Sequence, residues 1–384
     1  MSIIAISFIQ GLQYSVSPVL SQIQEQYADV NVSLIQMLVT APALLSMIVA
    51  LVSGRLVAKI SKKKMLVVAG LIAGVTGFLP YLANSFALLF ISRTLYGVAL
   101  GLACTLNTAV VAEFFEGDER VSVMGIQAAS IGAGMMIITT SVGRLGLLGY
   151  QYSYVINIIG FISMLAIAFF LPDTTLEKSL ETEEIKINKK VIFISFLGMI
   201  EVLFLITFTT NIAMHISGDL TGDAGVSGIL IGVFSIAQIV MGLILGMLIK
   251  VTKNYTLPVA MLSFSIGGML LVLYPSNYLI LMIASVFCGF SQGMFVPQAM
   301  VEVSGAVKPV ATAMAAACFT CALNLGQLVS PTILNTLSKV IFNEVNTSNV
   351  YKIASIGMTI AAVMVIISEA STKTVKQKKS EEVL

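Results

Sequence analysis

The chain has 384 residues, of which 57% are hydrophobic and only 10% are charged, and its mean hydropathy is +0.98. These values exclude a soluble protein of two or three domains and indicate a polytopic membrane protein. The formal net charge of +2 says little about partners, and we expect no nucleic acid among them.

Apolar runs of about 20 residues, each long enough to cross a bilayer as a helix, recur along the chain. The first begins directly after Met1 without a basic segment before it, which argues against a cleaved signal peptide. Twelve spans are predicted, near residues 2–23, 32–57, 65–83, 85–112, 121–143, 150–171, 191–214, 225–249, 255–274, 277–301, 310–337 and 349–369.

The basic residues lie almost entirely on one side of this arrangement. Of the 21 Lys and Arg residues, Arg93 falls inside a span and only Arg144, Lys339 and Lys352 fall on the side opposite to the basic loop 54–64. Because Lys and Arg in short loops resist translocation, this bias places loop 54–64 and both termini in the cytoplasm. We therefore expect a multi-pass protein of the cell membrane, surrounded by membrane lipid and monomeric.

The chain also repeats after 192 residues, which is half of its length. Glycines recur at this offset in four pairs: Gly54 and Gly246, Gly97 and Gly289, Gly101 and Gly293, Gly134 and Gly326. We predict an N-terminal six-helix bundle at 1–172, a cytoplasmic linker at 173–190, a C-terminal six-helix bundle at 191–369 and a cytoplasmic tail at 370–384. Two similar bundles that meet at the midplane are an architecture of secondary transporters.

In the loop after the second span, Gly54 is followed by the cations Lys59, Lys63 and Lys64, and position 58 is Ala58. This loop resembles a motif of the major facilitator superfamily, whose glycine and cation positions these residues occupy and which has an acid where Ala58 stands. In the family this acid bonds across the two bundles and holds the cytoplasmic side shut. Its absence therefore predicts an equilibrium displaced toward the inward-open state.

Further segments carry the resemblance in the family's order and spacing. They are 93–101 in span four, Glu119, Arg120 and Gly125 at the start of span five, and 149–157 at the start of span six. Segment 11–20 is similar to span one of twelve-span drug:proton antiporters, although the Gly-Pro pair in span five of those exporters is absent. The resemblance implies an all-α integral membrane protein with twelve transmembrane helices in two pseudo-symmetric six-helix bundles, the major facilitator fold.

Two ionisable residues fall deep inside predicted spans, where each costs at least about 2.5 to 3.5 kcal/mol. Glu201 lies near the midplane of span seven with no cation within two helical turns, which suits proton coupling or a cationic substrate. Arg93 lies about 12 Å along the helix axis from the outer end of span four and is a candidate for proton coupling, gating or substrate contact. The alternatives are a structural hydrogen bond for Glu201 and a structural cation bonded to carbonyls or to span one for Arg93.

Spans one, four, seven and ten line the cavity in the resembled fold. Their polar residues give the predicted substrate-binding set: Gln13, Tyr14, Asn107, Asn211, Gln292 and Gln298. Asn and Gln in lipid seek partners or water, so the alternative role for about half of the intramembrane amides is bonding between helices.

Gating residues are expected toward the cytoplasmic ends of the spans: Gly54, Lys59, Lys63, Lys64, Glu113, Arg120 and Glu302. His215, at the outer end of span seven, is expected to be solvated. Cys318 and Cys321 have no second pair and no His nearby, so we expect neither a metal site nor a cofactor.

The sequence thus predicts a secondary active transporter that moves a small amphipathic organic compound by alternating access, as proton-coupled efflux. Proton-coupled uptake of an organic anion held by Arg93 is one alternative, and a non-transporting sensor or lipid flippase on the same scaffold is another. The chain has no Walker loop and no nucleophile with a paired base, so we expect no enzyme activity.

Overall fold

The computed structural model describes residues 1–57, 59–82, 84–173, 188–307 and 312–381. Within these ranges the regular structure is entirely helical, since a helix satisfies its own backbone hydrogen bonds inside lipid. Ala58 lies outside the described residues, and so does nearly all of the predicted linker 173–190.

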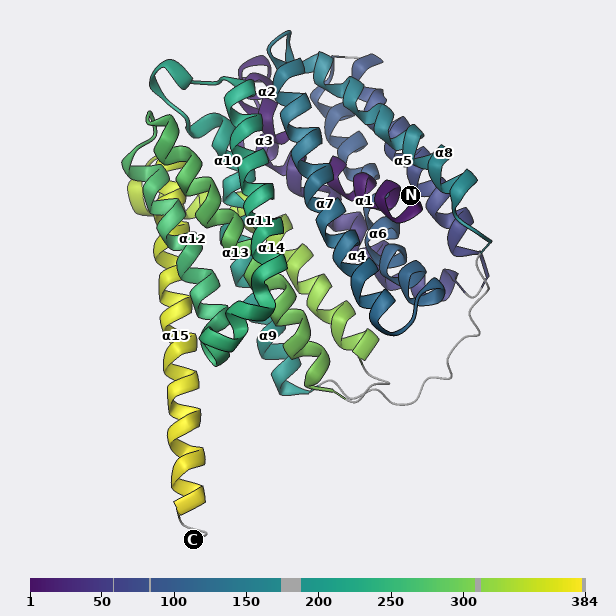
Figure 1. Ribbon diagram of the computed structural model, residues 1–384. Helices are drawn as coiled ribbons and strands as arrows, with labels where there is room; N and C mark the ends of the chain where they lie inside the picture. Colours follow the sequence, from purple (N-terminus) through teal and green to yellow (C-terminus); the bar gives the residue numbers. More distant parts are fainter. Residues whose placement is uncertain (58, 83, 174–187, 308–311, 382–384) are drawn as a thin grey trace.

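The described residues of the N-terminal half supply six crossings. Figure 1 draws this half in purple and blue. Its elements are α1 (Ser2–Gly11), η1 (Leu12–Tyr14), η2 (Ser17–Val19), α2 (Leu20–Gln26), α3 (Val32–Thr40), α4 (Pro42–Leu56), α5 (Lys62–Leu82), α6 (Phe86–Phe114), α7 (Gly117–Gly146), η3 (Tyr150–Asn157) and α8 (Ile158–Phe170). The first crossing is broken into the short turns η1 and η2 around Pro18, because proline has no N–H to continue an α-helix.

The C-terminal half supplies the other six. Its elements are α9 (Lys189–Leu205), α10 (Thr207–His215), η4 (Gly218–Leu220), α11 (Ala224–Thr252), η5 (Lys253–Tyr255), α12 (Thr256–Leu273), α13 (Tyr278–Gly305), α14 (Thr312–Phe342) and α15 (Thr347–Glu381). Of the 11 stretches long and apolar enough to cross a membrane, the 50-residue stretch Ala224–Leu273 contains both α11 and α12. Every predicted span therefore has a helical counterpart among the described residues.

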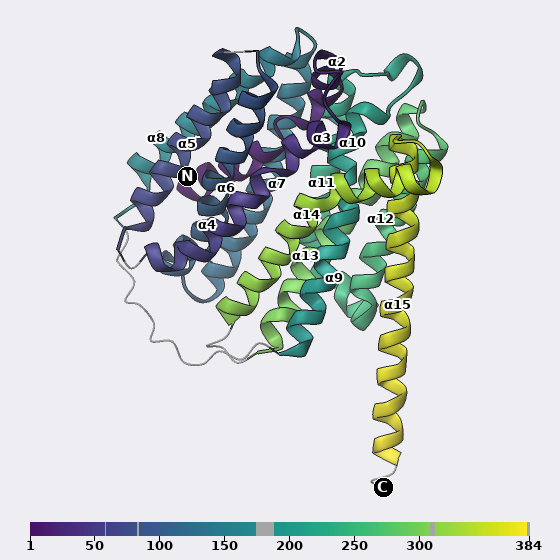
Figure 2. The same ribbon diagram turned by 180° about the vertical axis from the view of Figure 1, so that it is seen from behind.

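Two apolar cores reflect the two halves. One core takes its members from residues 6–171 together with Ala213 and Ala224, and the other from residues 191–365 together with Met135. Figure 1 and Figure 2 show the two bundles side by side, and α15 extends beyond them.

The repeat of 192 residues has a direct structural basis. A Cβ added at Gly97 or Gly101 of α6 would lie under 3.0 Å from a backbone oxygen of α4, at Pro42 and Ser46. The glycines of α13 that lie 192 residues later, Gly289 and Gly293, meet the oxygens of Phe234 and Gln238 on α11, which lie 192 residues after Pro42 and Ser46. The same close helix contact is thus built twice.

The two ends of the molecule differ in charge. We call the end with the exposed Lys59, Lys64 and Lys250 the basic end, and the end with the exposed Glu25 and Asp29 the acidic end. In Figure 1 the acidic end is at the top, near α2 and α3. That the basic end faces the cytoplasm stays a prediction.

Helices α7 and α11, one from each bundle, pack closely at the acidic end. A Cβ at Gly143 would lie 2.5 Å from the Ala224 oxygen, and a Cβ at Gly228 would lie 2.5 Å from the Thr139 oxygen. Because a real Cβ does not approach so closely, only glycine permits this backbone contact between the bundles.

Toward the basic end the same two helix faces have no such contact. Gly125 lies on the same face of α7 as Gly132 and Gly143. Gly242 and Gly246 lie on the same face of α11 as Gly228. A Cβ at Gly125, Gly242 or Gly246 would meet nothing within 4 Å. The bundles are therefore joined at the acidic end of this seam and apart at its basic end.

Candidate functional site

Glu201 is fully buried on α9 and is incompletely bonded. Its Oε1 accepts a hydrogen bond from Ser291 Oγ of α13 at 3.5 Å, at the limit of such bonds, and its Oε2 has no partner. Within the described part of the chain Glu201 forms no ion pair. A buried carboxyl that lacks both a cation and a full set of hydrogen bonds is most stable in its neutral form.

The position of Glu201 is fixed by close packing of α9 against α14. A Cβ at Gly326 of α14 would clash with the backbone of Met199, and Ser330 Oγ of α14 donates to the Leu203 oxygen. These contacts hold one face of α9 on α14. Glu201 is turned toward α13 instead, where it meets Ser291.

Four of the predicted substrate-binding residues carry a buried polar atom without a partner. These atoms are Gln13 Nε2, Asn107 Oδ1, Gln292 Oε1 and Gln298 Oε1. An unpaired polar atom in a protein interior costs about 1–3 kcal/mol, and each of these four atoms has hydrogen-bonding capacity left for water or a bound molecule.

Three amides that were not in the predicted set share this property: Gln22 Oε1 on α2, Gln127 Oε1 on α7 and Gln327 Nε2 on α14. Gln22 belongs to span one, while Gln127 and Gln327 belong to spans five and eleven, outside the four spans that the resemblance assigns to the cavity. Their signal in the sequence is an amide within an apolar run.

The other two predicted substrate-binding residues differ from these four. Tyr14 in η1 is half-buried and packs against both apolar cores, which places it where the bundles meet. Asn211 on α10 has hydrogen-bond partners for both side-chain atoms, including Gln36 of the opposite bundle at 2.7 Å.

Arg93 on α6 is buried and bonded within its own bundle. Its Nε donates to the Leu38 oxygen at 3.0 Å, Nη1 donates to the Leu12 oxygen at 3.4 Å, and Nη2 donates to the Gln13 oxygen. The guanidinium carbon lies 5.0 Å from the centre of the Tyr96 ring. These contacts are those of the structural alternative, in which the cation is bonded to carbonyls. Two of these carbonyls belong to the broken first crossing and the third, that of Leu38, belongs to α3.

The predicted gating residues lie at the basic end, and the contacts described for them stay within one bundle. Lys62 Nζ lies 2.8 Å from Glu113 Oε2 and joins the start of α5 to the end of α6. Lys63 Nζ lies 3.7 Å from Asp173 Oδ1, and Glu302 Oε1 accepts from Gln298 Nε2 on the same helix.

The remaining gating predictions concern exposed or undescribed side chains. Lys59 and Lys64 are exposed. Gly54 and Arg120 lie in α4 and α7, but their surroundings are outside the described part of the structure.

The prediction that His215 is solvated is wrong. The side chain is 5% exposed, its Nδ1 lies 2.9 Å from Thr347 Oγ1, and its Nε2 lies 2.9 Å from the Leu271 oxygen. The ring also packs edge-on against Tyr351. Helices α12 and α15 cover the end of α10, and the spacing along α10 alone could not reveal this. Among the described residues no three His, Cys, Asp or Glu side chains gather as metal ligands would.

A cavity of about 300 Å³ lies between the bundles at the acidic end. Gln36 and Asn335 line it beside Asn211, and sequence reasoning missed both of them. Each is an amide within an apolar span, which is the signal that could have found them.

A sequence model described as the Major Facilitator Superfamily matches residues 3–206 and again residues 194–383. The chain belongs to the major facilitator superfamily. The resemblance seen in the motifs is therefore confirmed at the level of the family, and the fold is the one predicted, with twelve transmembrane helices in two pseudo-symmetric bundles. The two matches cover one half each, in agreement with the repeat.

Solved structures of transporters share this superfamily member's fold. The nucleoside transporter NupG, in a mutant form, matches with a TM-score of 0.77 and 14% identity over 95% of this chain and 98% of that chain. A POT family transporter in complex with a thioalcohol-conjugated peptide matches with a TM-score of 0.79 and 8% identity over 96% of both chains. A POT family transporter in complex with 5-aminolevulinic acid matches with a TM-score of 0.79 and 9% identity over 95% of both chains. No curated protein sequence matches the chain.

Proposed function

We propose that this superfamily member is a secondary active transporter that exports a small amphipathic organic compound across the cell membrane in exchange for protons, by alternating access. The observation that supports coupling of transport to protons is the state of Glu201. This residue is a fully buried carboxyl with one unpaired oxygen and no ion pair among the described residues.

The chemistry of coupling follows from the surroundings of this carboxyl. A carboxylate costs several kcal/mol more to bury than a neutral carboxyl. Glu201 therefore holds a proton while it is buried as in this structure. Exchange requires that Glu201 takes up this proton while the acidic end is open and gives it up toward the open basic end when the compound binds.

The packing between the bundles supports alternating access. Contacts at Gly143 and Gly228 join α7 to α11 at the acidic end, while Gly125 and Gly242 meet nothing within 4 Å at the basic end. If the basic end is cytoplasmic, this arrangement is inward-open, the state that Ala58 led us to expect. A rocking motion about the seam would reverse the two ends.

The unpaired amides support a substrate with both polar and apolar parts. Gln13 and Asn107 in one bundle and Gln292 and Gln298 in the other each offer one free donor or acceptor atom. Tyr14 adds an aromatic surface between the bundles. A few polar groups on a mostly apolar wall fix the orientation of an amphipathic ligand.

The contacts of Arg93 disfavour the alternative of organic-anion uptake. The guanidinium would have to leave the carbonyls of Leu12, Gln13 and Leu38 before it could bind a substrate carboxylate. Export is favoured by the resemblance of span one, with Gly11 and Pro18, to drug:proton antiporters. The proposal places the chain in that branch of the superfamily.

The test is transport in proteoliposomes that carry a pH gradient and a pH-sensitive dye, against a panel of amphipathic compounds. Proton movement opposite to the compound is expected, and it should be lost in Glu201→Gln. Glu25→Gln is the matched control, since Glu25 is exposed at the acidic end. Proton movement alongside the compound would overturn export, and equal coupling in Glu201→Gln would overturn the role of Glu201.

A further inference from the structure

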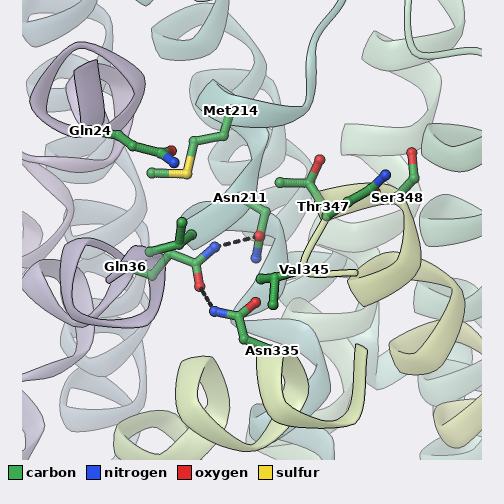
Figure 3. A pocket seen from close by; sticks show the side chains of 10 residues that line it. Gln24, Gln36, Asn211, Met214, Asn335, Val345, Thr347 and Ser348 are labelled. Atoms are coloured by element: carbon green, nitrogen blue, oxygen red, sulfur yellow. Dashed lines mark hydrogen bonds between the residues drawn. The ribbon is translucent and has the colours of Figure 1, made fainter. Parts of the chain in front are cut away.

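Three amide side chains meet between the bundles at the acidic end, as Figure 3 shows. Gln36 Nε2 of α3 donates to Asn211 Oδ1 of α10 at 2.7 Å, and Gln36 Oε1 accepts from Asn335 Nδ2 of α14 at 2.8 Å. Their exposed fractions are 1%, 1% and 4%. We call Gln36, Asn211 and Asn335 the amide latch.

Both ends of the amide latch are anchored by further hydrogen bonds. Asn335 Nδ2 also donates to Ser33 Oγ of α3 at 2.9 Å. Asn211 Nδ2 donates to the Thr207 oxygen at 3.1 Å and to Thr210 Oγ1 at 3.0 Å. Because these bonds hold its NH₂ group against its own helix, Asn211 turns its oxygen toward α3, where it can only accept a bond from the other bundle.

The hydrogen bonds that join described residues of the two bundles all lie in the acidic half. Besides those of the amide latch and Ser33, they are Ser21 Oγ to the Gly222 oxygen at 3.4 Å and Thr332 Oγ1 to Met37 Sδ at 3.8 Å. Both of these are long and therefore weak. Between described residues of the two bundles, the short bonds are those made by the amide latch and Ser33.

The amide latch borders the cavity of about 300 Å³ at the acidic end, and none of the described residues that line it is ionisable. The rest of its polar lining consists of Gln24, Asn346, Thr347 and Ser348, beside apolar side chains such as Met214. Amides and hydroxyls bind uncharged donor and acceptor groups well and give a bare charge no counter-ion.

We propose that the amide latch is the closure of the acidic end, and that it opens when water or uncharged hydrogen-bonding groups of a passing solute take over its bonds. The part played by the solute rests on the proposed transport function, while the closure itself does not. Exchange of one amide bond for another changes the free energy little, whereas a buried ion pair could not be separated without a large penalty. The latch can thus be tight when closed and still open readily.

The closure is tested by double electron–electron resonance between spin labels at the acidic end. The labels are placed by Asp29→Cys in one bundle and Glu344→Cys in the other, both exposed, after replacement of the four native cysteines. Gln36→Leu removes both latch bonds and should raise the ratio of long to short distances about tenfold. Gln24→Leu is the matched control, because it changes the same residue type in the same cavity without a described hydrogen bond, and it should leave the distances unchanged.

A second variant keeps the test decisive. Asn335→Leu removes the bonds from Asn335 to Gln36 and to Ser33. It should give a rise of similar size, and it carries the test alone if Gln36→Leu does not fold. Distances equal to those of the parent in every folded latch variant would overturn the proposal. The measurement needs neither substrate nor a proton gradient, so its outcome is separate from that of the transport assay.

Discussion

The acidic and basic ends of the seam between α7 and α11 show opposite packing on the same two helix faces. At the acidic end Gly143 and Gly228 allow backbone to touch backbone, while at the basic end Gly125 and Gly242 meet nothing. A glycine in a helix that packs against nothing costs about 0.5–1 kcal/mol relative to alanine. The difference indicates that the basic-end glycines serve a second packing, in which the basic end is closed.

Several independent interactions stabilise the acidic end, and each of them can be removed by its own substitution. Arg93 braces the broken first crossing, the glycines bring α7 onto α11, and the amide latch joins α3 to α10 and α14. The predictions below separate these contributions, from the largest expected effect to the smallest.

Arg93→Met should lower the free energy of unfolding by about 3 kcal/mol or more, because several buried carbonyls lose their donor at once. Arg93→Lys should recover only part of this loss, since an ammonium lacks the planar fork. Thermal unfolding in detergent measures the change. Arg144→Met, an exposed arginine at the same end, is the control. Equal stability of Arg93→Met and Arg144→Met would show that Arg93 does not brace the fold.

Gly143→Ala should weaken closure of the acidic end by about 1–3 kcal/mol, because the added Cβ overpacks the contact with Ala224. The spin labels introduced at residues 29 and 344 should report longer distances. Gly125→Ala makes the same change on the same face of α7 where nothing is near, and it should leave these distances as they are. If both variants behave alike, the seam does not control the acidic end.

Gly242→Leu should change the stability of the described state by less than about 0.5 kcal/mol, because the site is exposed. Its effect should appear in transport, since the larger side chain hinders closure of the basic end. Labels introduced by Glu119→Cys and Lys250→Cys should then stay at the open distance under conditions that close the parent. Normal transport by Gly242→Leu would mean that these faces never come together.

The sequence was sufficient to predict the fold because hydropathy and the repeat constrain it strongly. The offset of 192 residues that pairs Gly97 with Gly289 also pairs their contact partners, Pro42 with Phe234. The burial of Glu201 could be predicted as well, because its place in the interior follows from counting residues along a single span.

Contacts between spans could not be predicted in the same way. Gln36 bonds to Asn211 and Asn335 only because three helices from two bundles are rotated toward one point, and no period in a single span specifies that rotation. His215 shows the same limit, since its burial depends on α12 and α15. Hence the polar residues of each span could be identified, but their partners could not.

Protonation of Glu201 should affect which end of the molecule is open, because burial in the state described here favours the neutral, protonated carboxyl. Low pH should therefore favour the closed acidic end, and rising pH should shift the population toward the state in which Glu201 is hydrated. Glu201→Gln mimics the neutral carboxyl and should keep the acidic end closed at every pH. His215 is present in both proteins, so any titration of its own persists in the variant.

The most direct test measures the distances at both label pairs, one at each end, from about pH 6 to about pH 8, in the parent and in Glu201→Gln. The account predicts that the acidic-end and basic-end distances change in opposite directions with pH in the parent and do not change in the variant. The same pH dependence in both proteins would contradict the claim that a proton on Glu201 drives the exchange of open ends.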